Sequence, residues 1–180
     1  FAAFSRGFSA LDGAQSGQMK GDIQLKPLHL AGLRAIYGTE TSTERRERIA
    51  AMIARSKTPQ GELFVKEEFA RADLPHRRRA LLQLLSENYP ERNYAYIRAL
   101  AEDAVLRDIV LRHIVTHGDA RELAYIRSVA ENAPESQYRI IAFVGVARWE
   151  QPAATLDIYL RALRSQDEAL QRGAITAFRD

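Results

Sequence analysis

The sequence contains no cysteine, little lysine and no long apolar run, and each absence removes a class of protein. Without cysteine the chain has no disulfide, no cysteine-ligated zinc and no thiol nucleophile. The absence does not choose a compartment, because the reducing cytoplasm and a cysteine-poor periplasm both permit it. The longest apolar runs, such as IIAFVGVA at 140–147, fall far short of the roughly 20 residues of a membrane helix. We expect a soluble protein, and the sequence leaves its localisation open.

Motifs of the common enzyme classes are also missing. The chain has no glycine-rich phosphate loop after a strand, no nucleophile elbow and no triad spacing. The adjacent acids at 67–68 and 102–103 do not share a helical face, and such pairs are typical of solvated helix surfaces. We therefore predict a protein that is not an enzyme and that has no catalytic residue.

Two histidines, His113 and His117, stand four residues apart in HIVTH and so share one face of a helix. A zinc protease needs a glutamate directly after the first histidine, and Ile114 occupies that place. The alternative is a helix-terminal pair, in which protonated His117 lies near the C-terminal carbonyl groups of its helix. We predict neither a metal site nor a cofactor site.

The charge of the chain is mixed. The 26 basic and 23 acidic residues leave a net charge of +3, with the acids spread among the bases, which is a weak signal for nucleic acid. Nearly all the bases are arginine. Genome composition explains that bias as well as bidentate recognition of carboxylates or phosphates does.

The second half of the chain repeats itself. The stretch AYIRALAED at 95–103 returns as AYIRSVAEN at 124–132 and more loosely as DIYLRALRS at 157–165. With the three tyrosines aligned, the copies lie 29 and 34 residues apart, which suits a unit of two helices and their turns. A more apolar helix precedes each copy, with turn-forming residues between them. One such unit cannot bury its own apolar surface, so the sequence predicts stacked helix-turn-helix units.

This pattern, from about Leu74 to Asp180, resembles HEAT-like repeats of the armadillo/HEAT class of alpha solenoids. The resemblance implies an all-α fold, a right-handed alpha-alpha superhelix of HEAT-like helix pairs with an extended concave surface. The motif is degenerate: a HEAT unit has an aspartate in the turn and an arginine about six residues later, whereas Asp119 precedes Arg127 by eight. Tetratricopeptide-like stacking is the lesser alternative, without its tryptophan and glycine signature.

The first half of the chain is more divergent. Helices are predicted at 43–55, with Thr43 as the cap, at 61–72, and at 28–37, ended by Gly38. Together with the clearer repeats at 74–180, the divergent helices at 28–73 are predicted to form one helical-repeat domain over residues 22–180.

Residues 1–21 differ in character, because glycine is frequent among them. Phe1, Phe4, Phe8 and Leu11 follow helical spacing and predict a segment that caps the first apolar face of the array. Docking to a partner or a membrane surface, and simple flexibility, are the alternatives.

Repeating units place equivalent side chains in rows, and tyrosine and arginine are enriched at interface hot spots. The candidate partner-binding residues in the repeats are Tyr96, Arg98, Tyr125, Arg127, Tyr159 and Arg161. The alternative is an internal ladder between repeats, with tyrosine packed between units and arginine bonded to a carboxylate or carbonyl. A dense positive cluster, HRRR at 76–79, adds Arg77 and Arg78 as candidates for an acidic partner; a solvated face with acidic neighbours is the alternative.

The sequence therefore favours a noncatalytic scaffold that binds a partner protein or peptide along the solenoid. A nucleic-acid-binding or base-repair HEAT-like protein is the alternative, with arginines along the concave face, and an inhibitor or immunity-type protein is a further one. The last helix ends on the apolar residues Ala174, Ile175, Ala177 and Phe178. This ending predicts either that the chain continues beyond Asp180 or that the helix packs on another copy, so the oligomeric state stays open.

Overall fold

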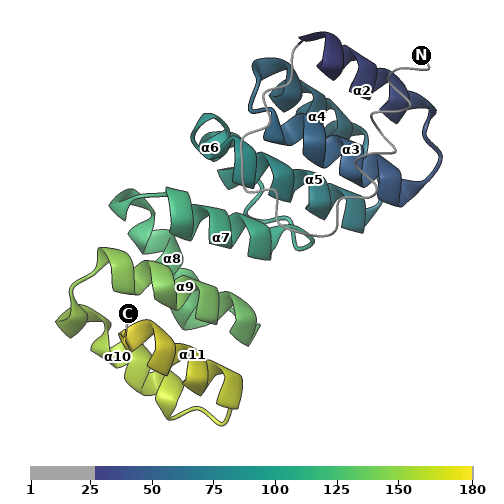
Figure 1. The fold of residues 1–180 in the computed structure, drawn as a ribbon. Helices are drawn as coiled ribbons and strands as arrows, with labels where there is room; N and C mark the ends of the chain where they lie inside the picture. The colour runs from purple at the N-terminus through teal and green to yellow at the C-terminus, as the bar shows by residue number, and fades with distance from the viewer. Residues whose placement is uncertain (1–26, 180) are drawn as a thin grey trace.

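The computed structural model describes residues 27–179, and this part of the chain consists of helices joined by turns and loops, with no strand (Figure 1). The predicted all-α class is confirmed. The ten α-helices of this part are α2 (Pro27–Thr39), α3 (Thr43–Arg55), α4 (Pro59–Arg71), α5 (Pro75–Asn88), α6 (Pro90–Arg98), α7 (Arg107–His117), α8 (Leu123–Asn132), α9 (Ser136–Trp149), α10 (Pro152–Leu163) and α11 (Glu168–Arg179). A short 3-10 helix, η1 (Ala120–Glu122), precedes α8. The predictions for residues 1–21 lie outside the described residues.

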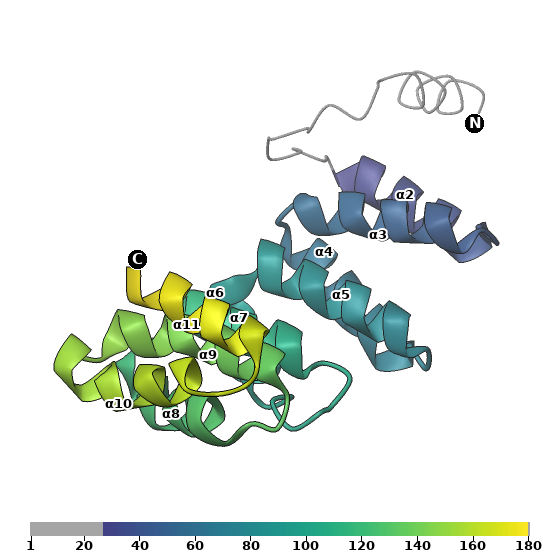
Figure 2. The same ribbon diagram turned by 90° about the horizontal axis from the view of Figure 1, so that it is seen from below.

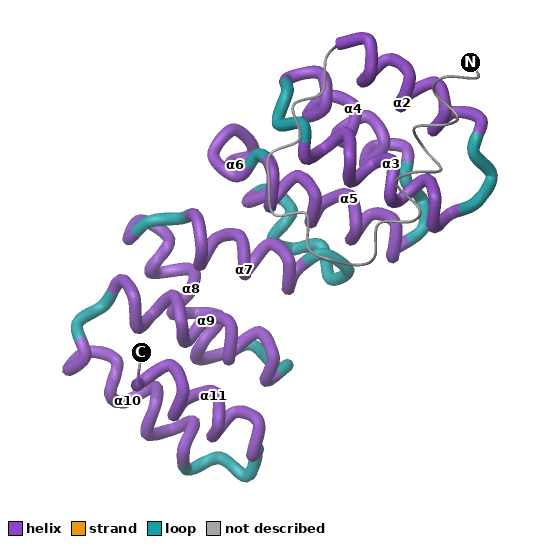
Figure 3. Tube along the Cα trace, viewed as in Figure 1, coloured by secondary structure: helices purple, strands orange, loops and turns teal. Residues whose placement is uncertain are grey.

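The helices pack in the order of the chain. Helices α3, α5, α7, α9 and α11 contact one another in succession and lie side by side in Figure 1. Helices α4 and α6 each pack against the odd-numbered helices that precede and follow them, while α8 packs on α9 and α10 on α11. Figures 2 and 3 show the same succession from a second side and as a trace, with short loops between consecutive helices. None of the described helices combines the length and the apolar composition that crossing a membrane requires.

Local signals set the starts of the helices. Ser42 caps α3, with its side chain accepting a hydrogen bond from the Arg45 amide, so the predicted cap Thr43 is instead the first helical residue. Thr58 caps α4 by accepting from the Gly61 amide at 3.1 Å. Proline occupies the first turn of α4, α5, α6 and α10, where its missing N–H costs no hydrogen bond.

The first copy of the repeated stretch is only partly helical, which corrects the expectation of a continuous helix. Helix α6 ends at Arg98, and residues 99–106 form turns, whereas the second copy remains helical in α8 to Asn132. The Asp103 carboxylate stabilises the turns, because it accepts from the Val105 amide at 3.0 Å and pairs with Arg78 across to α5. The apolar residues on either side of the helix end still face the core, because Ile97 and Ala101 are both buried.

Burial defines the register of the repeats better than the tyrosines do. An isoleucine and an alanine four residues later are buried in each of the three copies: Ile97 and Ala101, Ile126 and Ala130, and Ile158 and Ala162. These pairs are 29 and 32 residues apart, and not 29 and 34. In α10, Tyr159 therefore turns toward the core. Leu160, which the alignment on tyrosine matches with the buried Ile126, is 39% exposed.

Helix α7 packs against neighbours on more than one side. Five of its apolar side chains are buried: Ile109, Val110, Leu111, Ile114 and Val115. They cover most of the circumference of the helix, and α5, α6 and α9 all pack against it. The core thus continues from one helix pair to the next.

Two glycines in helices provide a test of the packing. A Cβ on Gly61 would lie 2.6 Å from the Ile53 carbonyl oxygen and 2.7 Å from the Tyr89 hydroxyl, whereas a Cβ on Gly38 would meet nothing within 4 Å. We expect Gly61→Ala to lower the free energy of unfolding by about 1–3 kcal/mol. Gly38→Ala should raise it by up to about 1 kcal/mol, because alanine favours the helix. Urea unfolding followed by circular dichroism measures both, and equal stability of the two variants would contradict the packing.

Candidate protein-binding surface

The repeated arginine of α6 is tied to the next helix pair. The Arg98 Nε donates to a Glu122 carboxylate oxygen at 2.9 Å, and its guanidinium lies 4.1 Å from the centre of the Tyr125 ring. A guanidinium over an aromatic face is held by the ring quadrupole as well as by packing. Arg98 and Tyr125 are therefore brought together in the seam between α6 and α8.

The repeated arginines of α8 and α10 share one charge network. Arg127 donates to Glu150 and to Glu131, the latter at 3.2 Å, and its third nitrogen lies 3.6 Å from Asp157. Arg161 donates to Glu131 at 3.3 Å and to Asp157 at 3.1 Å. The three repeated arginines thus have carboxylate partners inside the chain, which is the geometry of the internal ladder. Arg161 is the most exposed of them.

The three repeated tyrosines lie in three different environments. Tyr96 is 39% exposed, with its ring in edge contact with Phe69 and beneath the Lys66 ammonium. Tyr125 is half-buried under Arg98. Tyr159 is only 3% exposed, and its hydroxyl donates to the Phe143 carbonyl at 3.1 Å. The tyrosines therefore do not form one surface row. The reason is that Ile158 and Ala162 face the core in α10, and this turns Tyr159 inward as well.

The arginines of the HRRR cluster have acidic neighbours. Arg77 donates to Glu68 at 2.6 Å, Arg78 pairs with Asp103 at 3.0 Å, and Arg79 makes a bidentate pair with Asp108 at 2.7 and 2.8 Å. These carboxylates come from α4, from the turn after α6 and from α7. They offset the unfavourable position of cations at the N-terminus of α5.

Glu68 is buried, which corrects the interpretation of residues 67–68 as a solvated pair. Its side chain accepts from the Tyr37 hydroxyl at 2.7 Å, from Arg77 and, at 3.3 Å, from Arg71. Burial raises the pKa of Tyr37, and the hydrogen bond to the carboxylate adds to the effect. Burial alone would lower the pKa of the Arg77 guanidinium, but Tyr37 and Glu68 raise it. The sequence signal was present, because Glu68 follows Phe64 by one helical turn on the buried face of α4.

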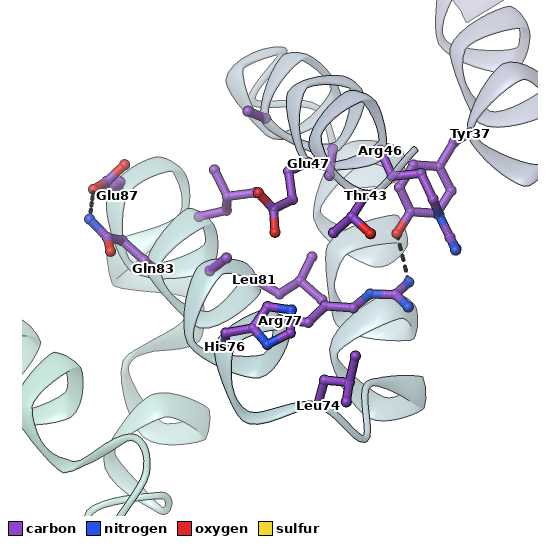
Figure 4. Close-up of a pocket in the computed structure, with 14 residues that line it drawn as sticks. Tyr37, Thr43, Arg46, Glu47, Leu74, His76, Arg77, Leu81, Gln83 and Glu87 are labelled. Carbon is purple, nitrogen blue, oxygen red and sulfur yellow. Dashed lines mark hydrogen bonds between the residues drawn. The ribbon is translucent and has the colours of Figure 1, made fainter. Parts of the chain in front are cut away.

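A groove lies between α3 and α5, and we call it the α3–α5 groove. Its volume is about 430 Å³. Small and aliphatic side chains form much of its lining: Ala50, Ala51, Ala80, Leu81 and Leu84. Figure 4 shows Tyr37, Arg46 and Arg77 at one end of the groove, and Gln83 and Glu87 at the other. No sequence motif predicted this groove, because the groove depends on the distance at which α3 and α5 pack.

A second groove, of about 320 Å³, lies between α5 and α7 and shares Gln83 and Glu87 with the first. His113 lines it but is almost fully buried, and its Nδ1 lies 2.8 Å from the Ser86 hydroxyl oxygen. The His117 ring centre is 5.0 Å away. Burial, helped by His117, lowers the pKa of His113 to about 4, so the ring is neutral at physiological pH. Among the described residues, no three potential ligands gather in a way that would hold a metal ion.

The comparisons with known proteins add no assignment. Family models, curated proteins and solved structures give no match to this chain. The Ser86 and His113 side chains form a hydrogen-bonded pair between two helices, and the Nε2 of His113 has no hydrogen-bond partner to orient it as a catalytic base. The features that are suited to binding are the α3–α5 groove and the exposed members of the repeats, Tyr96 and Arg161.

Two adjacent glutamates test the buried charge cluster. Glu68→Gln removes the carboxylate that Arg77, Arg71 and Tyr37 share, and we expect the free energy of unfolding to fall by about 2–3 kcal/mol. Glu67→Gln removes only a half-exposed pair with Arg34 and should cost about 0–1 kcal/mol. Denaturant unfolding at neutral pH measures both values. A loss from Glu68→Gln no larger than that from Glu67→Gln would show that the cluster is not stabilising.

The buried histidine gives the stability of the protein a defined pH dependence. The pKa of His113 is about 4 in the folded chain, below its ordinary value of 6.5, so between these values the unfolded state binds the proton more readily. The contribution of neutral His113 to stability is therefore lost as the pH falls from about 6.5 to 4. When the pH is lowered from 7 to 4.5, the free energy of unfolding should fall by about 1–2 kcal/mol less in His113→Gln than in the wild type.

Urea midpoints measured across this pH range test the prediction. His76→Gln, at an exposed position on α5, is the control and should follow the wild type. Identical pH profiles for wild type and His113→Gln would contradict the assignment.

Proposed function

We propose that this chain is a noncatalytic protein-interaction scaffold, built as a right-handed alpha solenoid of HEAT-like helix pairs. The packing of helices in chain order, with α3, α5, α7, α9 and α11 side by side in one row, supports this architecture. An array of this kind presents a long surface on which binding contacts are distributed. Its partner is a protein or a peptide.

The observation that carries the proposal is the α3–α5 groove. A concave surface with an aliphatic lining and charged ends suits a peptide segment, which offers both kinds of side chain. Tyr96 and Arg161 extend the binding surface along the array, because both are exposed and both residue types are enriched at hot spots.

Nucleic-acid binding fits the surface less well. It needs arginines that are free to contact successive phosphates, whereas Arg98, Arg127 and Arg161 each contact at least one carboxylate of the chain. An inhibitor or immunity-type role is a special case of protein binding and meets the same test.

The test compares what the full chain binds with and without nuclease. We expect a retained protein partner to survive nuclease treatment, and to bind the purified chain directly with an affinity that changes less than tenfold between 50 and 200 mM salt. Tyr96→Ala should weaken binding of the partner measurably. Ala95→Ser, at the adjacent exposed position on α6, is the matched control and should leave binding unchanged. Capture of nuclease-sensitive material alone, with a steep salt dependence, would contradict the proposal and favour nucleic acid.

A further inference from the structure

We infer that the α3–α5 groove binds a partner peptide segment that places a carboxylate side chain against Arg46 and aliphatic side chains along the groove lining. This inference rests on the proposed function and names the chemistry of the partner. Its basis is the state of Arg46, the charge around it and the lining of the groove.

Among the described residues, Arg46 has no hydrogen-bond acceptor. Its guanidinium lies 4.6 Å from the centre of the Tyr37 ring, and its side chain is 35% exposed at the groove. Its Nε is buried without a hydrogen-bond partner, and the nearest carboxylate oxygen, on Glu68, is 3.9 Å from a terminal nitrogen. That separation is too long for a hydrogen bond. The two terminal nitrogens also make no hydrogen bond with the described residues and, unlike the Nε, they are not buried, so they are the donors that a ligand oxygen can reach from the groove.

The charges at this end of the groove favour an anionic group. Three arginines, Arg46, Arg71 and Arg77, lie within 4 Å of the single carboxylate of Glu68, so positive charge is in excess there. The other acids that line the groove make no ion pair with these three arginines. Glu87 lies at the far end, where it accepts from Gln83 at 2.7 Å, and Glu47 makes no ion pair within 4 Å with Arg46 or Arg77. A planar carboxylate is the group that a guanidinium pairs with best in a peptide.

The groove lining selects a peptide. Ala50, Ala51 and Ala80 leave room between the two helices, and Leu81 and Leu84 add aliphatic surface. A volume of about 430 Å³ is in the range of ligand pockets and accepts several side chains. Nucleic acid would place phosphates beside Glu47 and Glu87 and would leave the aliphatic lining uncovered. The occupant is therefore an acidic and aliphatic segment of a protein.

A library of random 12-residue peptides, displayed and selected on the full chain, provides the probe. We expect the selected peptides to carry Asp or Glu together with aliphatic residues. Arg46→Gln should raise the dissociation constant of a selected peptide about tenfold or more, as measured by fluorescence anisotropy. The matched control is Arg55→Gln, which makes the same charge change on the same helix outside the groove and should leave binding within about twofold.

A second variant keeps the test independent of Arg46. Ala51→Leu fills the groove without changing charge, and it should abolish the binding of the same peptides while circular dichroism shows retained helix. Binding that both variants leave intact would overturn the inference. Peptide binding that appears only after Phe4→Asp and Phe8→Asp would also overturn the inference, because the occupant of the groove would then be a segment of this chain. An oligomer of the wild type that Ala51→Leu dissociates would overturn it as well, because the occupant would then be a second copy of the chain.

The outcomes separate this inference from the proposed function. If selected peptides, or a partner that withstands nuclease, bind elsewhere on the array, the groove assignment fails and the scaffold survives. If the full chain binds only nucleic acid and selects no peptide, both fail.

Discussion

None of the helix pairs within residues 27–179 covers its apolar surface alone, and the rest of the structure depends on that constraint. Helix α7 shows it most clearly, because Ile109, Leu111 and Ile114 are all buried and three helices, α5, α6 and α9, pack against it. The energy of burial is therefore gained between pairs as much as within them. Helices that follow one another along the chain therefore pack in order.

Charged side chains form ion pairs between successive helix pairs, at the edges of the apolar contacts. Arg98 reaches Glu122, and Arg127 reaches Glu150, so that each arginine joins its own helix pair to the next one. Many of the described arginines pair with carboxylates within the chain, and others, such as Arg139 and Arg148, donate to backbone carbonyls. Arg46 lies against the Tyr37 ring at the edge of the α3–α5 groove, where its Nε is buried and has no hydrogen-bond partner among the described residues.

Much of the fold could be predicted from the sequence, and the errors have physical reasons. Apolar periodicity and proline positions predicted the helices, but not the end of α6, where Asp103 bonds the chain into turns. Alignment on tyrosine misplaced Tyr159, because burial follows Ile158 and Ala162. Glu68 was assigned to the surface since a carboxylate seldom lies in a core, and three partners from α2, α4 and α5 make its burial tolerable. The groove depends on the spacing of α3 and α5, which only the packed helices define.

The central claim is that the array binds a protein segment in the α3–α5 groove, and amide hydrogen exchange tests it most directly. The full chain would be measured alone and saturated with the tightest selected peptide. The account predicts that exchange slows at least about tenfold in α3 and α5, which line the groove, and stays unchanged in α9, α10 and α11. Protection confined to α6, α8 and α10, or protection nowhere, would contradict it.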